Sequence, residues 1–234
     1  MKRNSWWLRS AAGWRNSIVY LKSILHTYGA TEQDALLLLF ESEKKWMNNT
    51  MQHRIILCGG NGAGKSTLGR TLADAMKLCF MDIEDYYFPC KNTEYAYASP
   101  RSTEEVASLL LHDMKRASGF VLAAVKADYG TEISSMFTCA VFIDVPKEIR
   151  MQRIHERSYR KFGERMLPGG DLFEKEQRFF DMVQNRSDES ILQWLDSLQI
   201  QVIHIDGLRP VEENAPFILE RLSRNTSHKN TSRF

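Results

Sequence analysis

One glycine-rich run holds the residues best able to do chemistry. It fits the pattern G-x-x-x-x-G-K-[ST] and consists of Gly59, Gly60, Asn61, Gly62, Ala63, Gly64, Lys65, Ser66 and Thr67. Glycines let the backbone turn its N–H groups toward a phosphate, and a helix that begins there adds the positive end of its dipole. In such a loop Lys65 reaches the β- and γ-phosphates, Ser66 binds Mg²⁺ and Thr67 lies beside the α-phosphate. The run therefore predicts a site for ATP and Mg²⁺.

Three carboxylates follow the next apolar run, namely Asp82, Glu84 and Asp85. Ligands of open α/β sheets bind at the carboxyl ends of strands, where these residues are expected. If the strand continues, Asp82 and Glu84 share one face, and Asp85 points elsewhere and is assigned to the acceptor. We expect either Asp82 or Glu84 to accept the proton of an attacking hydroxyl and the other to orient Mg²⁺ through water. The alternative is a solvated acidic turn.

Four arginines recur at helical spacing further along the chain. Arg150, Arg153, Arg157 and Arg160 step by 3, 4 and 3 residues, so they share one face of a helix. One interpretation is that some of them clamp the transferring phosphate and stabilise charge in the transition state. The other is a solvated face on which Glu156 pairs with Arg153 and Arg160.

The elements that must position these groups alternate between apolar strands and helical patterns. Strands are expected at 55–58, 78–83, 120–125, 140–143 and 202–205. Helices are expected at 68–78, 103–115, 146–159, 171–185, 189–198 and 211–222. Continuous apolar strands that alternate with helices predict an α/β, three-layer P-loop NTPase fold, in which helices cover both faces of a five-stranded parallel sheet.

The loop and the acidic residues together resemble the adenylate-kinase-like family of small P-loop kinases, over residues 53–222. Residues 59–67 with an acidic strand end are similar to shikimate and gluconate kinases. Residues 84–89 (EDYYFP) are similar to the D-D-F-[FY]-x-P element of uridine and nicotinamide riboside kinases. The resemblance implies that Glu84 is the base, where the family has aspartate, while Asp82 matches the first aspartate of the D-x-D of shikimate kinase.

The same resemblance implies three further parts. Residues 143–146 (IDVP) with Arg153 and Arg157 are similar to a strand ending in D-V-P before an R-x-x-x-R helix. Residues 159–172 would be a lid that closes to exclude water, with Arg160 and Arg165 as its cations. Residues 91–115 would be a small acceptor-binding insert, and 202–210 the loop on the adenine side.

The insert carries Tyr95, Tyr97 and Arg101, which suit a flat or anionic acceptor, although ordinary packing explains them equally well. A separate Walker B aspartate is undecided between Asp128, Asp144 and Asp206. Each of these follows an apolar strand. The resemblance implies that the fourth and fifth strands, which carry the last two, lie away from the metal.

Composition bounds the remaining function classes. The 234 residues are 43% hydrophobic and 26% charged, which excludes a disordered chain, and 31 basic against 29 acidic residues give no reason to expect nucleic acid. The cysteines include no C-x-x-C pair, so a metal or redox site is disfavoured. No apolar stretch approaches the roughly 18 residues of a membrane span, and no signal peptide is evident, so we expect a cytoplasmic protein without a membrane partner.

The domain organisation expected is a P-loop kinase-like domain at 54–222 between two appendages. Residues 1–53 read as a helical extension, or as sequence upstream of a true start at Met47 or Met51, and 223–234 read as a disordered polar tail. The sequence does not distinguish a monomer from a dimer.

Function follows as two competing hypotheses. The first is an ATP- and Mg²⁺-dependent phosphotransferase that acts on a hydroxyl or phosphate of a nucleoside, nucleotide or polyol. The second is an ATP-binding regulatory module with weak or no turnover, whose N-terminal helices report the bound state. A GTPase is disfavoured because no N-K-x-D motif follows, and a motor ATPase because no room is left for its extra parts.

Overall fold

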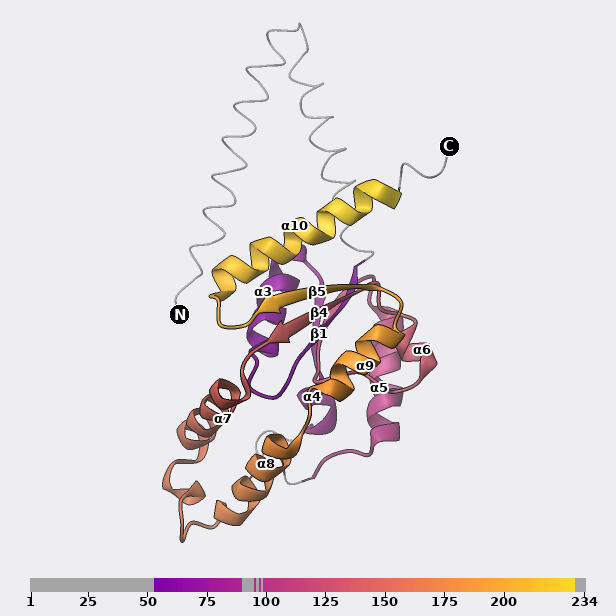
Figure 1. The fold of residues 1–234 in the computed structure, drawn as a ribbon. Coiled ribbons are helices and arrows are strands. Elements are labelled where there is room, and N and C mark those ends of the chain that lie inside the picture. The colour runs from indigo at the N-terminus through magenta and orange to yellow at the C-terminus, as the bar shows by residue number, and fades with distance from the viewer. Residues whose placement is uncertain (1–52, 90–94, 96, 98, 230–234) are drawn as a thin grey trace, which may run out of the picture. The chain divides into compact units, whose positions relative to one another are not determined.

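The computed structural model describes residues 53–89, 95, 97 and 99–229. Five parallel strands form one sheet in the order β2-β3-β1-β4-β5 (Figure 1). The strands are β1 (Arg54–Cys58), β2 (Cys79–Asp82), β3 (Phe120–Ala123), β4 (Cys139–Asp144) and β5 (Gln201–Asp206). This parallel sheet with helices on both faces confirms the predicted α/β class of a P-loop NTPase.

The central strand β1 is apolar because both of its faces are covered. Ile55 and Leu57 pack into one core layer, Ile56 and Cys58 pack into the other, and all four are fully buried. β1 pairs with β3 on one side and β4 on the other. The glycine-rich loop that leaves β1 therefore starts from the middle of the sheet.

Two helical layers enclose the sheet. On one face lie α3 (Lys65–Met76) and α10 (Val211–Lys229), and on the other α5 (Thr103–Arg116), α6 (Thr131–Ser134) and α9 (Glu189–Ser197) (Figure 1). The helix α5 begins where predicted because Ser102 and Glu105 form a reciprocal capping box.

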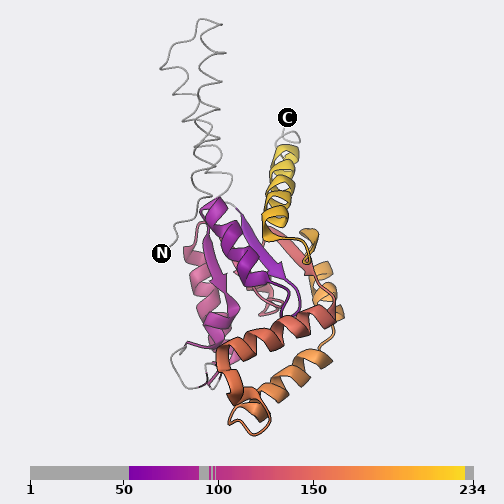
Figure 2. The same ribbon diagram turned by 90° about the vertical axis from the view of Figure 1, so that its left-hand side faces the viewer.

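A third group of elements has a small apolar core of its own. The helix α7 (Lys147–Phe162), the short helix η1 (Gly163–Met166) and α8 (Phe173–Asn185) pack around Ile154, Met166, Phe180 and Val183. The two long helices lie side by side in both ribbon views (Figure 2). This hairpin includes residues 159–172, the segment expected to form a lid.

The second strand is shorter than predicted. It ends at Asp82, whose side chain accepts a hydrogen bond from the backbone N–H of Glu84 and so caps the helix α4 (Ile83–Tyr87). The strand does not continue to Glu84, so the condition under which Asp82 and Glu84 would share one face is not met. Local capping by the aspartate outweighs the apolar run that precedes it.

The chain ends also differ from prediction where they are described. The helix α10 continues to Lys229, past the Leu222 at which we placed its end, and Glu220 pairs with Arg224 one turn along it. A helix exposed to solvent needs no apolar periodicity in its last turns, so the pattern could not mark this end. The predicted helical extension at 1–53 lies, except for His53, outside the described residues.

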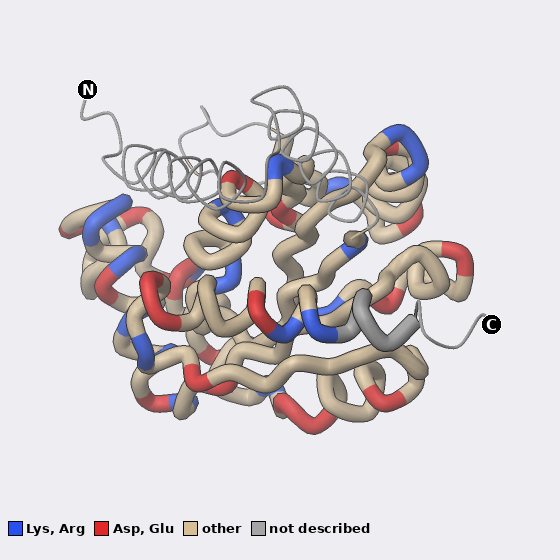
Figure 3. Tube along the Cα trace, turned by 90° about the horizontal axis from the view of Figure 1, so that it is seen from above, with Lys and Arg blue, Asp and Glu red and all other residues tan. Residues whose placement is uncertain are grey.

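Charge is distributed over the described part of the chain in both signs, and Figure 3 shows basic and acidic positions interspersed along the trace. Among the described residues, no helix is both long and apolar enough to cross a membrane.

Candidate functional site

The glycine-rich loop runs from the end of β1 to the first turn of α3. Gly64 precedes the helix with φ 95°, and Lys65 is the first helical residue. The Lys65 ammonium folds back over the loop and donates to the carbonyls of Gly59 (3.0 Å) and Gly60 (2.8 Å). Ser66 and Thr67 follow in the first turn, so the loop residues lie in the order that a phosphate-binding helix start requires.

An arginine from α7 closes the back of this loop. Arg150 is only 3% exposed, and a β-carbon placed on Gly60 would lie 1.6 Å from its Nη1 atom, so a larger residue at Gly60 would displace the guanidinium. The guanidinium donates to the carbonyl of Val145 (3.0 Å) and to the carboxylate of Asp188 (2.5 Å). Arg150 therefore holds the loop, the end of β4 and the start of α9 together.

We expect Arg150→Met to lower the free energy of unfolding by about 3 kcal/mol, because it leaves the carboxylate of Asp188 without its charged partner. Chemical denaturation measures this change. The control is Arg160→Met at the exposed end of the same helix, expected to change stability by less than about 0.5 kcal/mol. Equal losses in the two variants would contradict the anchoring role.

Burial and nearby charges together give Lys65 an unusual pKa. Burial is the main reason that the pKa of Lys65 is lowered to about 8; the nearby Arg157 acts in the same direction, while the carboxylates of Glu84 and Asp82 oppose the shift. Of these two carboxylates Glu84 acts more strongly on the ammonium. The structure thus brings the loop lysine, both candidate carboxylates and one candidate arginine within electrostatic reach of each other.

Asp82 and Glu84 differ in their exposure and in their hydrogen bonding. Asp82 is 9% exposed and is engaged with the N–H of Glu84, whereas Glu84 is half-buried on α4. Asp85 is exposed on the same helix. Glu84 is therefore the better placed of the three to accept a proton.

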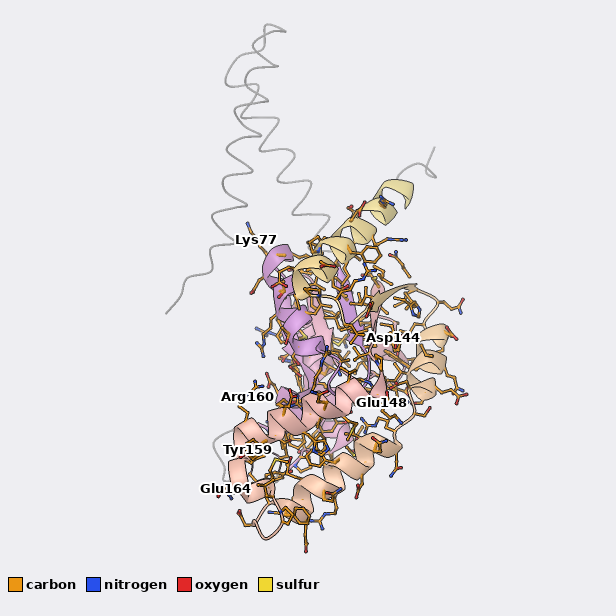
Figure 4. All side chains as sticks on the ribbon, turned by 60° about the vertical axis from the view of Figure 1, so that its left-hand side comes forward. Lys77, Asp144, Glu148, Tyr159, Arg160 and Glu164 are labelled. Carbon is orange, nitrogen blue, oxygen red and sulfur yellow. The ribbon has the colours of Figure 1, made fainter. Side chains whose placement is uncertain are left out.

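The four stripe arginines do not act as one surface. Arg150 is buried, Arg153 donates weakly to the carbonyls of Gly62 (3.5 Å) and Gly207 (3.3 Å), and Arg157 acts on Lys65. The remaining one, Arg160, is exposed near the far end of α7 from Glu148 (Figure 4).

The alternative is right about solvation at Arg157 and Arg160, which are exposed, and wrong about the pairing, because Glu156 instead accepts a bond from Gln152 (2.9 Å). The four arginines look equivalent by their spacing, but the packing of α7 against the loop gives each of them different surroundings.

A cavity of about 390 Å³ opens beside the loop on the side of Arg153. Its lining residues are Gly62, Ala63, Gly64, Thr67, Leu68, Ile143, Arg153, Gly207, Leu208, Arg209, Pro210, Val211 and Asn214. The Asn214 side chain donates to the carbonyls of Asp206 (2.9 Å) and Arg209 (3.3 Å), which fixes the turn after β5. This turn is the segment that we expected on the adenine side.

Residues of the predicted insert meet the α7–α8 hairpin. The Tyr95 hydroxyl donates to Glu176 of α8 (2.8 Å), and the Tyr95 ring contacts Tyr97 and Phe162, with centroids 5.6 and 5.4 Å away. Arg101 instead donates to the carbonyl of Tyr86 (2.9 Å), so it ties its segment to α4 as the packing alternative predicted.

The candidate lid arginine has a local partner. Arg165 pairs through two nitrogens with Asp171, and this guanidinium lowers the pKa of the Asp171 carboxyl below its usual range. The pair holds the turn between η1 and α8.

Arg186 is a site residue that the sequence analysis missed. It follows α8, and its Nη1 donates to the side chain of Asn61 in the loop (3.1 Å). A cation directly after the helix that follows a glycine-rich basic segment is the signal that would have found it. The contact places a third guanidinium at the loop, in addition to those of Arg150 and Arg153 from α7.

Of the three Walker B candidates, two have side-chain partners of their own and the third is exposed. Asp206 accepts a bond from the Leu208 N–H (2.8 Å), and Asp128 lies 3.4 Å from the ammonium of Lys126 and lines a different cavity, with Trp194. Asp144 is exposed at the end of β4 (Figure 4). In the described part of the chain, no three His, Cys, Asp or Glu side chains gather as a metal site. A hydroxyl and one carboxylate near a phosphate still fit Mg²⁺, which takes most of its ligands from phosphates and water.

The known proteins that this chain is similar to are distant from it in sequence. No family model matches the chain. It is similar to "Uncharacterized protein YqaC" of Bacillus subtilis strain 168, with 27% identity over 183 residues, which span 75% of this chain and all of that protein. A solved gluconokinase from Sinorhizobium meliloti 1021 is 16% identical with a TM-score of 0.48, over 79% of this chain and 99% of that one. At this distance neither similarity shows the family or the activity of this chain.

Proposed function

We propose that this protein is a kinase that moves the γ-phosphoryl group of ATP to a small-molecule acceptor. The proposal rests on the charged groups near Lys65, because the Glu84 carboxylate and the Arg157 guanidinium both act electrostatically on its ammonium. The lysine of a phosphate-binding loop marks the β- and γ-phosphates. A carboxylate and a guanidinium near that lysine are the groups that phosphoryl transfer requires, one for the proton and one for the charge.

The nucleotide would span the loop from the cavity to Lys65. The apolar side chains of Leu208 and Val211 line the cavity, where a base can pack, and Thr67 from the first turn of α3 lines it as well. With the base there, the phosphates follow the start of α3 toward Lys65.

In the transfer step an acceptor hydroxyl oxygen bonds to the γ-phosphorus while the bond from that phosphorus to the bridging β–γ oxygen breaks. The hydroxyl proton passes to the Glu84 carboxylate, and ADP leaves with the bond electrons. Arg157 stabilises the charge on the transferring group. Arg186, held by Asn61, supplies further positive charge at the loop.

Ser66 and Asp82 would hold Mg²⁺, the first directly and the second through water. The ion supplies neutralisation of phosphate charge when it is bound. Asp82 keeps acceptor capacity for this role, since its one described hydrogen bond is the cap to Glu84.

Release of ADP from Mg-ATP, with and without a deproteinised small-molecule extract, tests the proposal. We expect the extract to stimulate release, and Lys65→Ala to abolish that stimulation. The same slow rate in both conditions, together with tight ATP binding, would contradict the kinase and favour the regulatory module.

The affinity for Mg-ATP should fall as the pH rises above about 8, where free Lys65 loses its proton. Bound phosphates favour the ammonium and raise its pKa, so binding takes up a proton in this range and weakens by up to about tenfold per pH unit. Calorimetric titrations between about pH 7 and about pH 9.5 measure the trend. Lys65→Arg should remove it, because a guanidinium keeps its proton. A constant affinity for the wild type would contradict this role of Lys65.

A further inference from the structure

The buried carboxylate of Glu176 has one oxygen without a hydrogen-bond partner among the described residues. Glu176 of α8 is 1% exposed, and its Oε1 accepts the Tyr95 hydroxyl at 2.8 Å. Its Oε2 is buried and has no hydrogen-bond partner. A carboxylate oxygen removed from water is costly without a donor, so an orphan of this kind points to a group that arrives from outside.

Tyr97 connects this carboxylate with the transfer site. Its ring contacts Tyr95 at 5.6 Å and Phe88, just after α4, at 5.1 Å. Burial raises the pKa of the Tyr97 hydroxyl, and Glu84 and Glu176 raise it further. Glu84 and Glu176 therefore both lie near Tyr97. Because Glu84 is the proposed base, Glu176 lies on the side of Lys65 where the acceptor would bind, which we call the acceptor side.

The charges described on this side disfavour an anionic acceptor. Asp82, Glu84 and Glu176 all act on the Tyr97 hydroxyl, and Arg157 opposes them. Arg101, which we had considered as the cation for an anion, is bonded to a backbone carbonyl.

Cations lie on this side too. The Lys161 ammonium is 4.2 Å from the centroid of Tyr97, that of Lys175 is 5.4 Å from the centroid of Tyr95, and Arg178 acts on the Tyr95 hydroxyl. A phosphate or carboxylate bound at Glu176 Oε2 itself would nevertheless lie against a buried carboxylate for which no ion pair is described.

We infer that Glu176 Oε2 binds a hydroxyl or amino group of the phosphoryl acceptor, and that the acceptor is an uncharged or cationic molecule such as a polyol or nucleoside. Acceptors that carry phosphate or carboxylate are excluded. This inference rests on the proposed kinase function and narrows it, since a nucleotide was among the acceptors that the sequence allowed.

The charge class of the acceptor tests the inference without any variant. A deproteinised small-molecule extract is passed over an anion exchanger, and each fraction is incubated with the wild-type protein, Mg²⁺ and [γ-³²P]ATP. We expect a new labelled compound with the flow-through fraction, which holds neutral and cationic molecules. Label transfer only with the retained fraction would overturn the inference and leave the kinase standing. No transfer with either fraction would overturn the kinase, and the inference with it.

A pair of variants tests Glu176 itself on the active fraction. Glu176→Gln keeps an oxygen for Tyr95 but turns an N–H group toward the acceptor. We expect the amount of the active fraction that gives the half-maximal rate to rise about 10- to 100-fold. The KM for ATP should not change. Tyr95→Phe removes the hydroxyl that binds Oε1 and keeps the Glu176 carboxylate, and a rise below about threefold is expected. Equal rises in the two variants would mean that Glu176 only positions Tyr95, and would overturn its role in binding the acceptor.

Discussion

Glu84→Gln should lower kcat for phosphoryl transfer by about 10²- to 10⁴-fold, the range of general-base contributions. The amide keeps the size of the side chain and still accepts a hydrogen bond, but it cannot take the proton of the attacking hydroxyl. Glu84 is half-buried on α4 and is the strongest opposing charge on Lys65. Binding of Mg-ATP should change by less than about threefold, because the base contacts the acceptor rather than the nucleotide.

Steady-state kinetics with saturating acceptor and a separate titration of Mg-ATP measure the two effects. The matched control is Glu148→Gln, an exposed carboxylate at the start of α7 (Figure 4). Its kcat should stay within about twofold of the wild type. If Glu84→Gln retains full kcat, Glu84 is not the base.

Arg157→Ala should lower kcat by about 10³-fold with little change in stability. Removal of a cation that stabilises a transferring phosphoryl group costs about three to five powers of ten in related chemistry. Arg157 is exposed on α7, yet its charge acts on both Lys65 and Tyr97. A group that bridges the loop lysine and the acceptor side can respond to charge that develops between them.

The control for this variant lies on the same helix. Arg160→Ala removes a guanidinium three residues further on, and we expect kcat within about twofold of the wild type. Similar losses in the two variants would mean that the whole helix contributes a general positive field, and would contradict a specific role for Arg157.

The parts of this molecule that depend on local sequence could be predicted, because their causes are local. The loop at 59–67 needs only its glycines, its lysine and a strand and helix on either side. The strand and helix order follows from apolar runs and caps such as Ser102. The parallel sheet then follows, since such strands must be covered on both faces.

Contacts between distant segments could not be predicted from the same signals. Arg150 and Arg160 look alike in sequence, but one is buried against Gly60 and Asp188 and the other is exposed. Arg186 reaches Asn61 across 125 positions of the chain. These differences arise because α7 and α8 fold back on the loop, and no spacing within one helix encodes that packing.

The helix α4, which carries Glu84, also could not be predicted from the sequence pattern. The apolar run before it favours a strand, but one side-chain cap at Asp82 changes the backbone from strand to helix. This change moves Glu84 off the strand face shared with Asp82 and onto α4, where it acts on Lys65. A cap of this kind competes with the strand by a small free energy, about 1 kcal/mol, which a pattern of residue types does not resolve.

The fate of the γ-phosphoryl group tests the central claim most directly. The wild-type protein is incubated with Mg²⁺, [γ-³²P]ATP and the unfractionated small-molecule extract, and label is separated into organic phosphate and inorganic phosphate. The account predicts that most of the label released from ATP appears in one new organic phosphate, and that Lys65→Ala produces none. Release of the label only as inorganic phosphate, at a rate that the extract does not change, would contradict a phosphotransferase.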